Sequence, residues 1–209
     1  MDKIKIKNIF AAVFEKSVLD LLLAVLDPKE VKFWGTEGTA KYLKLKGLDA
    51  QSVVSGFDFD GRLKSINKNI FAAVLADKSK KSHLLELKKL WNYSSSEVEK
   101  NFGSSLQGRT IDSGKMEPID LAVVDLYKPD SQNFPESMDI GGQALIRAAI
   151  KNYKNVALAF DSESIEELTD HLSKNQGRSL LAFRKAQAKK AAKFISERCQ
   201  LELEMIKVI

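Results

Sequence analysis

The clearest strand in the sequence is the apolar segment 121–126, and it constrains the fold more than any other feature. Its residues are apolar except for Asp125, and such a run is typical of a strand that a parallel sheet buries on both faces. Further short strands are expected at 9–14, 31–34, 51–54 and 156–160, and helical patterns lie between several of them. Because strands alternate with helices, the sequence predicts an open parallel α/β sheet.

The length of 209 residues suits a single domain. We expect one domain over 1–209, with a core at about 9–160 and C-terminal helices at about 161–209. The segment 94–115 is rich in Ser and Gly and is expected to form a long surface loop or an insertion.

Two local patterns describe the C-terminal part in more detail. Ser164, followed by Ile, Glu and Glu, predicts a capping box that begins a helix ending near Leu172. Residues 179–207 show a helical pattern, with Cys199 on the predicted apolar stripe and Arg184 outside it. We therefore expect Cys199 to be buried.

Composition excludes several classes of protein. A single Cys excludes a disulfide framework and a Cys-rich zinc site, and two His leave little for a His-based metal centre. No apolar run reaches the roughly 18 residues that a membrane-spanning helix needs, so we expect no membrane partner. The N-terminus lacks the apolar segment of a signal peptide, which predicts a cytoplasmic protein. The net charge of +5 suits either nucleic acid or small phosphorylated substrates.

Three segments occupy positions where ligands of open α/β sheets bind, beyond the carboxyl ends of strands. Residues 35–39, Gly-Thr-Glu-Gly-Thr, offer hydroxyls and free N–H groups that suit a phosphate. Asp139 precedes two glycines at a helix entrance, and 61–65, Gly-Arg-Leu-Lys-Ser, is a basic cluster after a turn. On local grounds each segment also has a plainer interpretation, as a tight turn, an N-cap and a solvated loop respectively.

Taken together, these segments resemble the inosine-monophosphate (IMP) cyclohydrolase domain, the N-terminal part of the bifunctional purine-biosynthesis enzyme. The matching stretches stand in the family's order at 36–41, 61–65, 118–127, 138–142 and 147–152. The resemblance spans nearly the whole chain. It implies a parallel-sheet, three-layer α/β fold of the methylglyoxal-synthase-like kind with a C-terminal helical extension.

The resemblance also implies a reaction. The family closes the purine ring of formamido-imidazole-carboxamide ribonucleotide (FAICAR), giving IMP and water. The carboxamide nitrogen needs help in losing a proton as it attacks the formyl carbon, and the resulting oxyanion needs hydrogen-bond donors. No metal or other cofactor is implied.

The residues that match the family's site fall into two groups. In the catalytic group, Asp139 and Lys151 match a base and its cationic partner, Lys64 an oxyanion-side lysine, and Tyr127 a tyrosine that hydrogen-bonds the reacting region. Asp139 and Lys151 are twelve positions apart, so they have to meet through tertiary or dimer geometry. The positions implied for the phosphate and the nucleotide are Lys16, Thr36, Gly38, Thr39, Arg62, Ser65, Gly141 and Gly142.

The chain also departs from the family. Ala12 and Phe14 replace serines, Glu37 replaces a glycine, and Asn67 and Phe71 replace histidines. These changes leave an alternative: a catalytically lapsed paralogue that binds purine or imidazole ribonucleotides as a sensor. We favour the enzyme because the four implied catalytic residues are all retained, and we rank nucleic-acid binding last. The implied partners are a small nucleotide substrate, a second copy in a homodimer and a separate formyltransferase.

Overall fold

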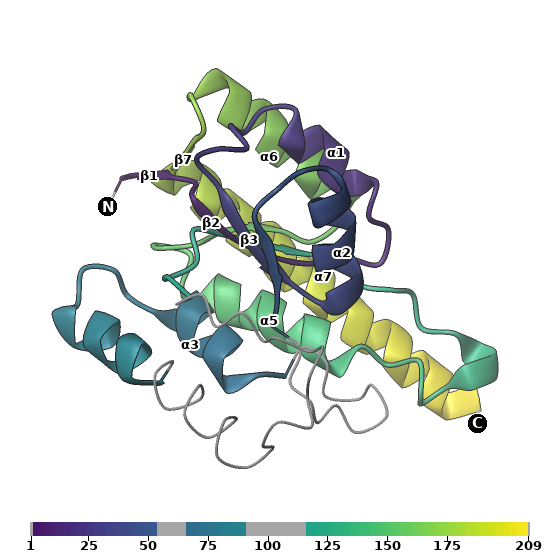
Figure 1. Cartoon of the computed structure of the whole chain (residues 1–209). Helices are drawn as coiled ribbons and strands as arrows, with labels where there is room; N and C mark the ends of the chain where they lie inside the picture. The colour runs from purple at the N-terminus through teal and green to yellow at the C-terminus, as the bar shows by residue number, and fades with distance from the viewer. Residues whose placement is uncertain (1, 54–65, 91–115, 209) are drawn as a thin grey trace, which may run out of the picture.

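A five-stranded parallel sheet forms the centre of the computed structural model, which describes residues 2–53, 66–90 and 116–208 (Figure 1). Its strands lie in the order β4-β3-β2-β5-β6, and each neighbouring pair is parallel. Their bounds are β2 (Asn8–Ala12), β3 (Lys32–Gly35), β4 (Ala50–Ser52), β5 (Leu121–Val124) and β6 (Ala157–Ala159). The predicted parallel α/β sheet is confirmed, and each of the five predicted strand segments overlaps one of its strands.

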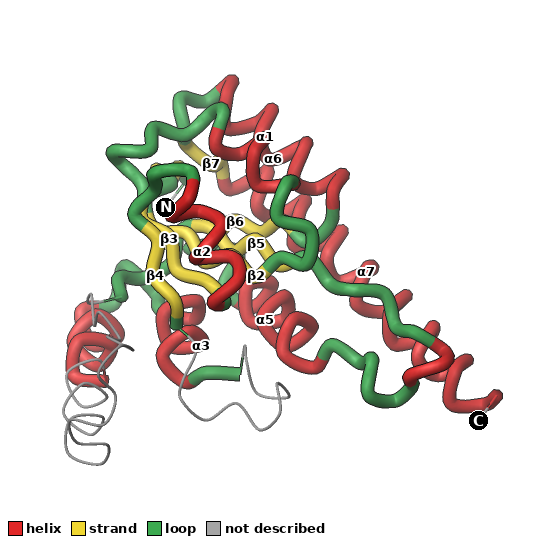
Figure 2. Tube along the Cα trace, turned by 45° about the vertical axis from the view of Figure 1, so that its right-hand side comes forward, coloured by secondary structure: helices red, strands yellow, loops and turns green. Residues whose placement is uncertain are grey.

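Helices cover both faces of this sheet, which gives the expected three layers (Figure 2). Successive side chains of a strand point to opposite faces, so Ile9 and Leu121 pack in one layer while Phe10 and Ala122 pack in the other. The first face is covered by α1 (Val18–Leu23), α2 (Glu37–Leu45) and α6 (Ser162–Lys174). The second is covered by α3 (Lys68–Leu75), α5 (Ile140–Lys151) and the first half of α7 (Leu181–Val208).

The strand order reverses between β2 and β5. After β2 the chain builds β3 and β4 to one side, and it then returns to add β5 and β6 on the other side. The loops that leave the carboxyl ends of β2 and β5 therefore run in opposite directions, and the region between such loops is where open α/β sheets bind ligands. The segments after Ala12 and Val124 are thus placed to form a site.

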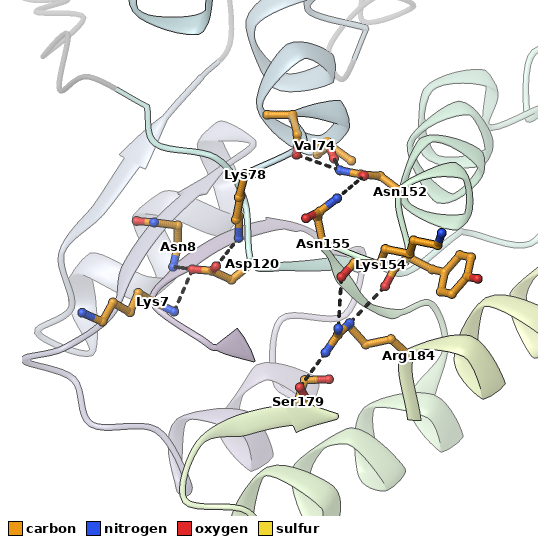
Figure 3. A network of polar contacts seen from close by, with 12 residues as sticks. Lys7, Asn8, Val74, Lys78, Asp120, Asn152, Lys154, Asn155, Ser179 and Arg184 are labelled. Carbon is orange, nitrogen blue, oxygen red and sulfur yellow. Dashed lines mark hydrogen bonds and ion pairs between the residues drawn. The ribbon is translucent and has the colours of Figure 1, made fainter. Parts of the chain in front are cut away.

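At the amino ends of the central strands, one buried carboxylate holds three segments together (Figure 3). Asp120 precedes β5, and its Oδ2 accepts hydrogen bonds from the backbone N–H groups of Lys7 (3.0 Å) and Asn8 (2.7 Å). Its Oδ1 accepts from the ammonium of Lys78. Asp120 is 8% exposed, and it ties the first residues of β2 and β5 to the segment after α3.

A second polar network holds the C-terminal end of α5 (Figure 3). The Asn152 side chain donates to the carbonyls of Val74 (2.7 Å) and Ala76 (3.0 Å), which fastens α5 to α3. Arg184, near the start of α7, is 1% exposed and its guanidinium donates to several carbonyls. These are the carbonyls of Tyr153, Lys154 and Ser179.

The buried face of α7 differs from the predicted apolar stripe. Arg184, which the pattern predicts outside that stripe, is buried, whereas Cys199, which it predicts on the stripe, is exposed. The prediction that Cys199 is buried is therefore wrong. The physical reason is that polar residues with partners on other elements occupy the buried face: Arg184 meets three carbonyls, and Glu202 meets Gln143.

Other local expectations also need correction. α6 begins at Ser162, with Asp161 as its N-cap, and Ser164 occupies the N3 position of the capping box rather than the N-cap. The antiparallel pair β1 (Lys3–Lys5) and β7 (Arg178–Leu180) was not predicted, nor were α3 and the helical residues 81–90. The predicted loop at 94–115 lies outside the described residues. Among the helices that the structure describes, none is both long and apolar enough to cross a membrane.

The Asp120 network predicts a large loss of stability on truncation. Asp120→Ala leaves two backbone donors and the Lys78 ammonium without their shared acceptor, and we expect it to cost about 2–4 kcal/mol. The exposed pair Asp170–Lys174 provides a matched control, and Asp170→Ala is expected to change stability by less than about 1 kcal/mol. Urea unfolding of both variants measures the difference, and equal costs would contradict this role for Asp120.

Candidate functional site

Four segments meet at the carboxyl edge of the sheet, around the reversal point. They are the loop after β2 with Phe14 and Lys16, the entrance of α2 at Thr36, the loop after β5 with Tyr127, and the entrance of α5 at Asp139. The parallel sheet brings them together, because the carboxyl ends of parallel strands share one edge.

Asp139 caps α5. Its Oδ1 accepts a hydrogen bond of 2.7 Å from the backbone N–H of Gly142. Burial raises the pKa of the Asp139 carboxyl above its ordinary value, and the negative charges of Asp125 and Glu202 act in the same direction, while the Gly142 bond and Arg198 oppose them. A carboxylate with a raised pKa binds a proton more readily at neutral pH, which suits a general base.

Tyr127 lies beside Asp139. Its hydroxyl donates to the carbonyl of Met138 at 3.3 Å, and its ring centroid is 6.4 Å from that of Phe14. Burial, together with the negative charge of Asp139, raises the pKa of the Tyr127 phenol. The phenol therefore keeps its proton at neutral pH and remains a hydrogen-bond donor. Tyr127 and Asp139, both predicted as catalytic, are thus brought together by the fold.

Lys16 lies over the N-terminus of α2. Its Nζ donates to the carbonyl of Phe14 at 2.7 Å, and its Cε is 3.8 Å from the position that a Cβ on Gly38 would occupy. The Thr36 and Thr39 hydroxyls are 3.1 Å apart in the first turn of this helix. A lysine, two hydroxyls and free N–H groups at a helix N-terminus are groups that bind phosphate.

Glu37 is the first residue of α2 and is exposed. A negative charge at this position complements the partial positive charge of the helix N-terminus. Glu37 therefore stabilises α2, although the N-terminus of this helix also contains the predicted phosphate-binding positions.

The two glycines after Asp139 are both buried. A Cβ on Gly142 would lie 2.4 Å from Leu126 Cδ2 and 2.6 Å from Asp139 Oδ2, so only glycine lets the helix approach the β5 loop and the capping carboxylate this closely. Gly142 therefore shapes the entrance of α5 and holds the Asp139 carboxylate through its N–H.

Lys151 is not near these residues within one chain. It is the last residue of α5 and Asp139 is the N-cap, so about 18 Å of helix separates them. Lys151 is exposed and lines, with Arg147, Phe71 and Ala192, a hollow of about 520 Å³ on the outer face of α3, α5 and α7. Three further predicted site residues, Arg62, Lys64 and Ser65, lie outside the described residues.

Sequence reasoning missed three charged residues near Asp139. Asp125 follows β5, its Oδ2 accepts from the Glu15 N–H at 3.4 Å, and burial raises its pKa. Arg198 and Glu202 belong to α7, which packs against α5 although the two helices are far apart in sequence. No local sequence pattern therefore indicates that these two residues lie near Asp139. Over 2–53, 66–90 and 116–208, no cluster of three or more His, Cys, Asp or Glu side chains is arranged to hold a metal ion.

No family model matches the chain. It is 31% identical over 202 residues to the bifunctional purine biosynthesis protein PurH of Rhizobium leguminosarum bv. trifolii, which is 91% of this chain and 33% of that protein. The chain resembles PurH. The PurH of Clostridium acetobutylicum is 30% identical over 181 residues, 81% of this chain and 32% of that protein.

This chain spans about a third of the length of the PurH proteins that it matches. A solved structure, described as the crystal structure of ForH, superposes with a TM-score of 0.64 at 22% identity, covering 96% of this chain and 98% of that one. The likeness to ForH shows the fold. The resemblance expected from the sequence is confirmed, and so is the methylglyoxal-synthase-like fold class.

The close packing around Gly142 predicts a position-specific effect of an added methyl group. Gly142→Ala forces a Cβ against Leu126 and the Asp139 carboxylate, and we expect it to cost about 1–3 kcal/mol of stability. Gly38→Ala is the control, because its Cβ meets only Lys16 Cε at 3.8 Å, and its change should stay within about 1 kcal/mol. Thermal and urea unfolding measure both, and a neutral Gly142→Ala would contradict the packing.

Proposed function

We propose that this chain is an IMP cyclohydrolase that closes the ring of FAICAR, giving IMP and water. The observation that carries the proposal is the half-buried Asp139 carboxylate beside the Tyr127 phenol at the reversal point of the sheet. The similarity to PurH over 91% of the chain supports a role in purine biosynthesis.

In the proposed reaction, Asp139 takes a proton from the carboxamide nitrogen as that nitrogen attacks the formyl carbon. A carbon–nitrogen bond forms, and the formyl C=O opens to an oxyanion. The oxyanion takes up one proton to become a hydroxyl, which takes up a second proton and leaves as water when the carbon–oxygen bond breaks. The formamido nitrogen loses its own proton, and its electron pair forms the carbon–nitrogen double bond of the ring, so the two protons lost from nitrogen equal the two gained by oxygen. Tyr127 donates a hydrogen bond to the reacting region, and Lys64 with the Ser65 N–H supports the oxyanion.

The 5′-phosphate is assigned to the Lys16 side of the crevice. Lys16, Thr36, Gly38 and Thr39 lie together at the entrance of α2, and Arg62 is the proposed additional cation. The Lys16 ammonium donates a hydrogen bond to the Phe14 carbonyl. In the proposed complex it donates instead to a phosphate oxygen above the N-terminus of α2.

We further propose that the active unit is a homodimer. Asp139 and Lys151 lie at opposite ends of α5, so one chain does not pair them. Two copies of α5 that pack antiparallel about a two-fold axis bring each Lys151 to the partner's Asp139 end. The hollow beside Lys151, with Phe71 and Ala192 in its lining, gives such a partner an apolar surface to cover.

The sensor remains the second candidate, and Phe14 is the observation that favours it. This side chain stands where the family has a serine, is 67% exposed, and faces both the Tyr127 ring and the Lys16 ammonium. An aromatic ring in the crevice is able to stack on a base without taking part in proton transfer.

Two further assignments rest on the cyclohydrolase reaction. The substrate carries a formyl group, so a separate formyltransferase has to supply it. We place both activities in the cytoplasm, where a single exposed thiol such as Cys199 stays reduced.

Turnover of FAICAR separates the enzyme from the sensor. Purified protein should convert FAICAR to IMP, followed by its absorbance change, and Asp139→Asn should lower kcat by about 10²–10⁴-fold because the proton acceptor is lost. Lys64→Ala should lose turnover as well. The exposed Asp170→Asn is the matched control and should retain full rate. Tight nucleotide binding in calorimetry without turnover above the spontaneous rate would establish the sensor instead.

A mixing experiment tests the homodimer. If Lys151 and Asp139 of one site come from different chains, a dimer of one Asp139→Asn chain and one Lys151→Ala chain contains one intact site. Equal mixing of the two inactive variants should then recover about a quarter of the wild-type rate, since half of the dimers are mixed. No recovery, with mixed dimers detected by mass, would contradict a site shared between chains.

A further inference from the structure

The Asp139 carboxylate lies in an acidic environment. From the β5 loop it faces Asp125 and Tyr127, and from α7 it faces Glu202 and Arg198. Asp161 and Glu15 add negative charge around Asp125. Among these groups Arg198 is positively charged, and its attraction acts on both the Asp125 and the Asp139 carboxylates.

The guanidinium of Arg198 is held in place by several contacts. Its Nη1 donates to the carbonyl of Tyr127 at 3.3 Å, and its Cζ lies 5.7 Å from the centroid of the Phe194 ring. That ring packs on Phe160, with centroids 5.1 Å apart. Because Phe160 directly follows β6 and Tyr127 follows β5, Arg198 is fastened to the same edge of the sheet as the site.

One turn further along α7, Glu202 is 6% exposed and accepts a hydrogen bond of 2.6 Å from Gln143 Nε2. Gln143 belongs to the second turn of α5, four residues after Asp139. This buried contact fixes the distance between α7 and the entrance of α5. Because Arg198 and Glu202 are four residues apart on α7, they lie on the same face of that helix, the face that meets α5 and the segment after β5.

We propose that Arg198 is a positioning residue of the site, which keeps the Asp139 carboxylate ionised among its acidic neighbours and orients the Tyr127 loop through its carbonyl. Its part in catalysis rests on the proposed function, since Asp139 is the proton acceptor of that reaction. Lys151 of the same chain is about 18 Å of helix away, whereas Arg198 is a cation of the described residues whose charge acts on Asp139.

The experiment follows the titration of Asp139 directly. Carboxyl ¹³C NMR of Asp-labelled protein gives its midpoint, and the signal that disappears in Asp139→Asn identifies it. Arg198→Ala should move the midpoint to higher pH, because a neighbouring cation favours the ionised form. Arg198→Lys should restore much of the wild-type midpoint. Lys193→Ala, on the same helix but exposed and paired with Glu197, is the control and should leave it unchanged.

Kinetics add a second measurement. The acid limb of kcat/KM should lie above the pH range of an ordinary aspartate in the wild type, and it should move to still higher pH in Arg198→Ala, in parallel with the NMR midpoint. An unchanged midpoint in folded Arg198→Ala overturns the inference. A midpoint that moves in a protein without turnover supports the electrostatic role of Arg198 and overturns the proposed cyclohydrolase reaction instead.

Discussion

The pairing of β2 with β5 is the constraint on which the rest of this structure depends. It joins Ile9 to Leu121 and Ala12 to Val124, and so brings together strands separated by more than half the chain. At the amino ends of this pair, the Asp120 carboxylate accepts hydrogen bonds from the backbone N–H groups of Lys7 and Asn8. Beyond the carboxyl ends of the two strands the chain diverges in opposite directions, and Asp139 and Tyr127 lie together in this region.

The chemistry of the crevice follows from a balance of burial and charge. Burial raises the pKa of Asp139, and neighbouring carboxylates add to this effect, whereas the Gly142 N–H and Arg198 stabilise the ionised form. The same balance keeps the Tyr127 phenol protonated. One chain thus places the Asp139 acceptor beside the Tyr127 donor, with Lys16 over the N-terminus of α2 nearby, and it leaves Lys151 exposed on the outer face of α5.

Local sequence patterns predicted the layers well because a buried parallel strand has to be apolar on both faces. The runs that became β2 to β6 needed no knowledge of their neighbours. The same reasoning failed for α7, where Arg184 is buried and Cys199 is exposed. A buried arginine needs hydrogen-bond acceptors for its guanidinium. Arg184 finds them in the carbonyls of Tyr153, Lys154 and Ser179, which lie outside α7, so the helical pattern of α7 alone does not predict its burial.

By itself, the sequence determined the parallel α/β sheet, the likeness to the cyclohydrolase domain and the residue types of the site, since these depend on local apolar runs and on short motifs. Only the tertiary structure decided which of those residues meet. It placed Tyr127 beside Asp139 and Lys16 over Gly38, set Lys151 at the far end of α5, and brought Arg198 to the site. The reason is physical: strand order and helix packing set the distances between these residues, and a single segment of the sequence determines neither of them.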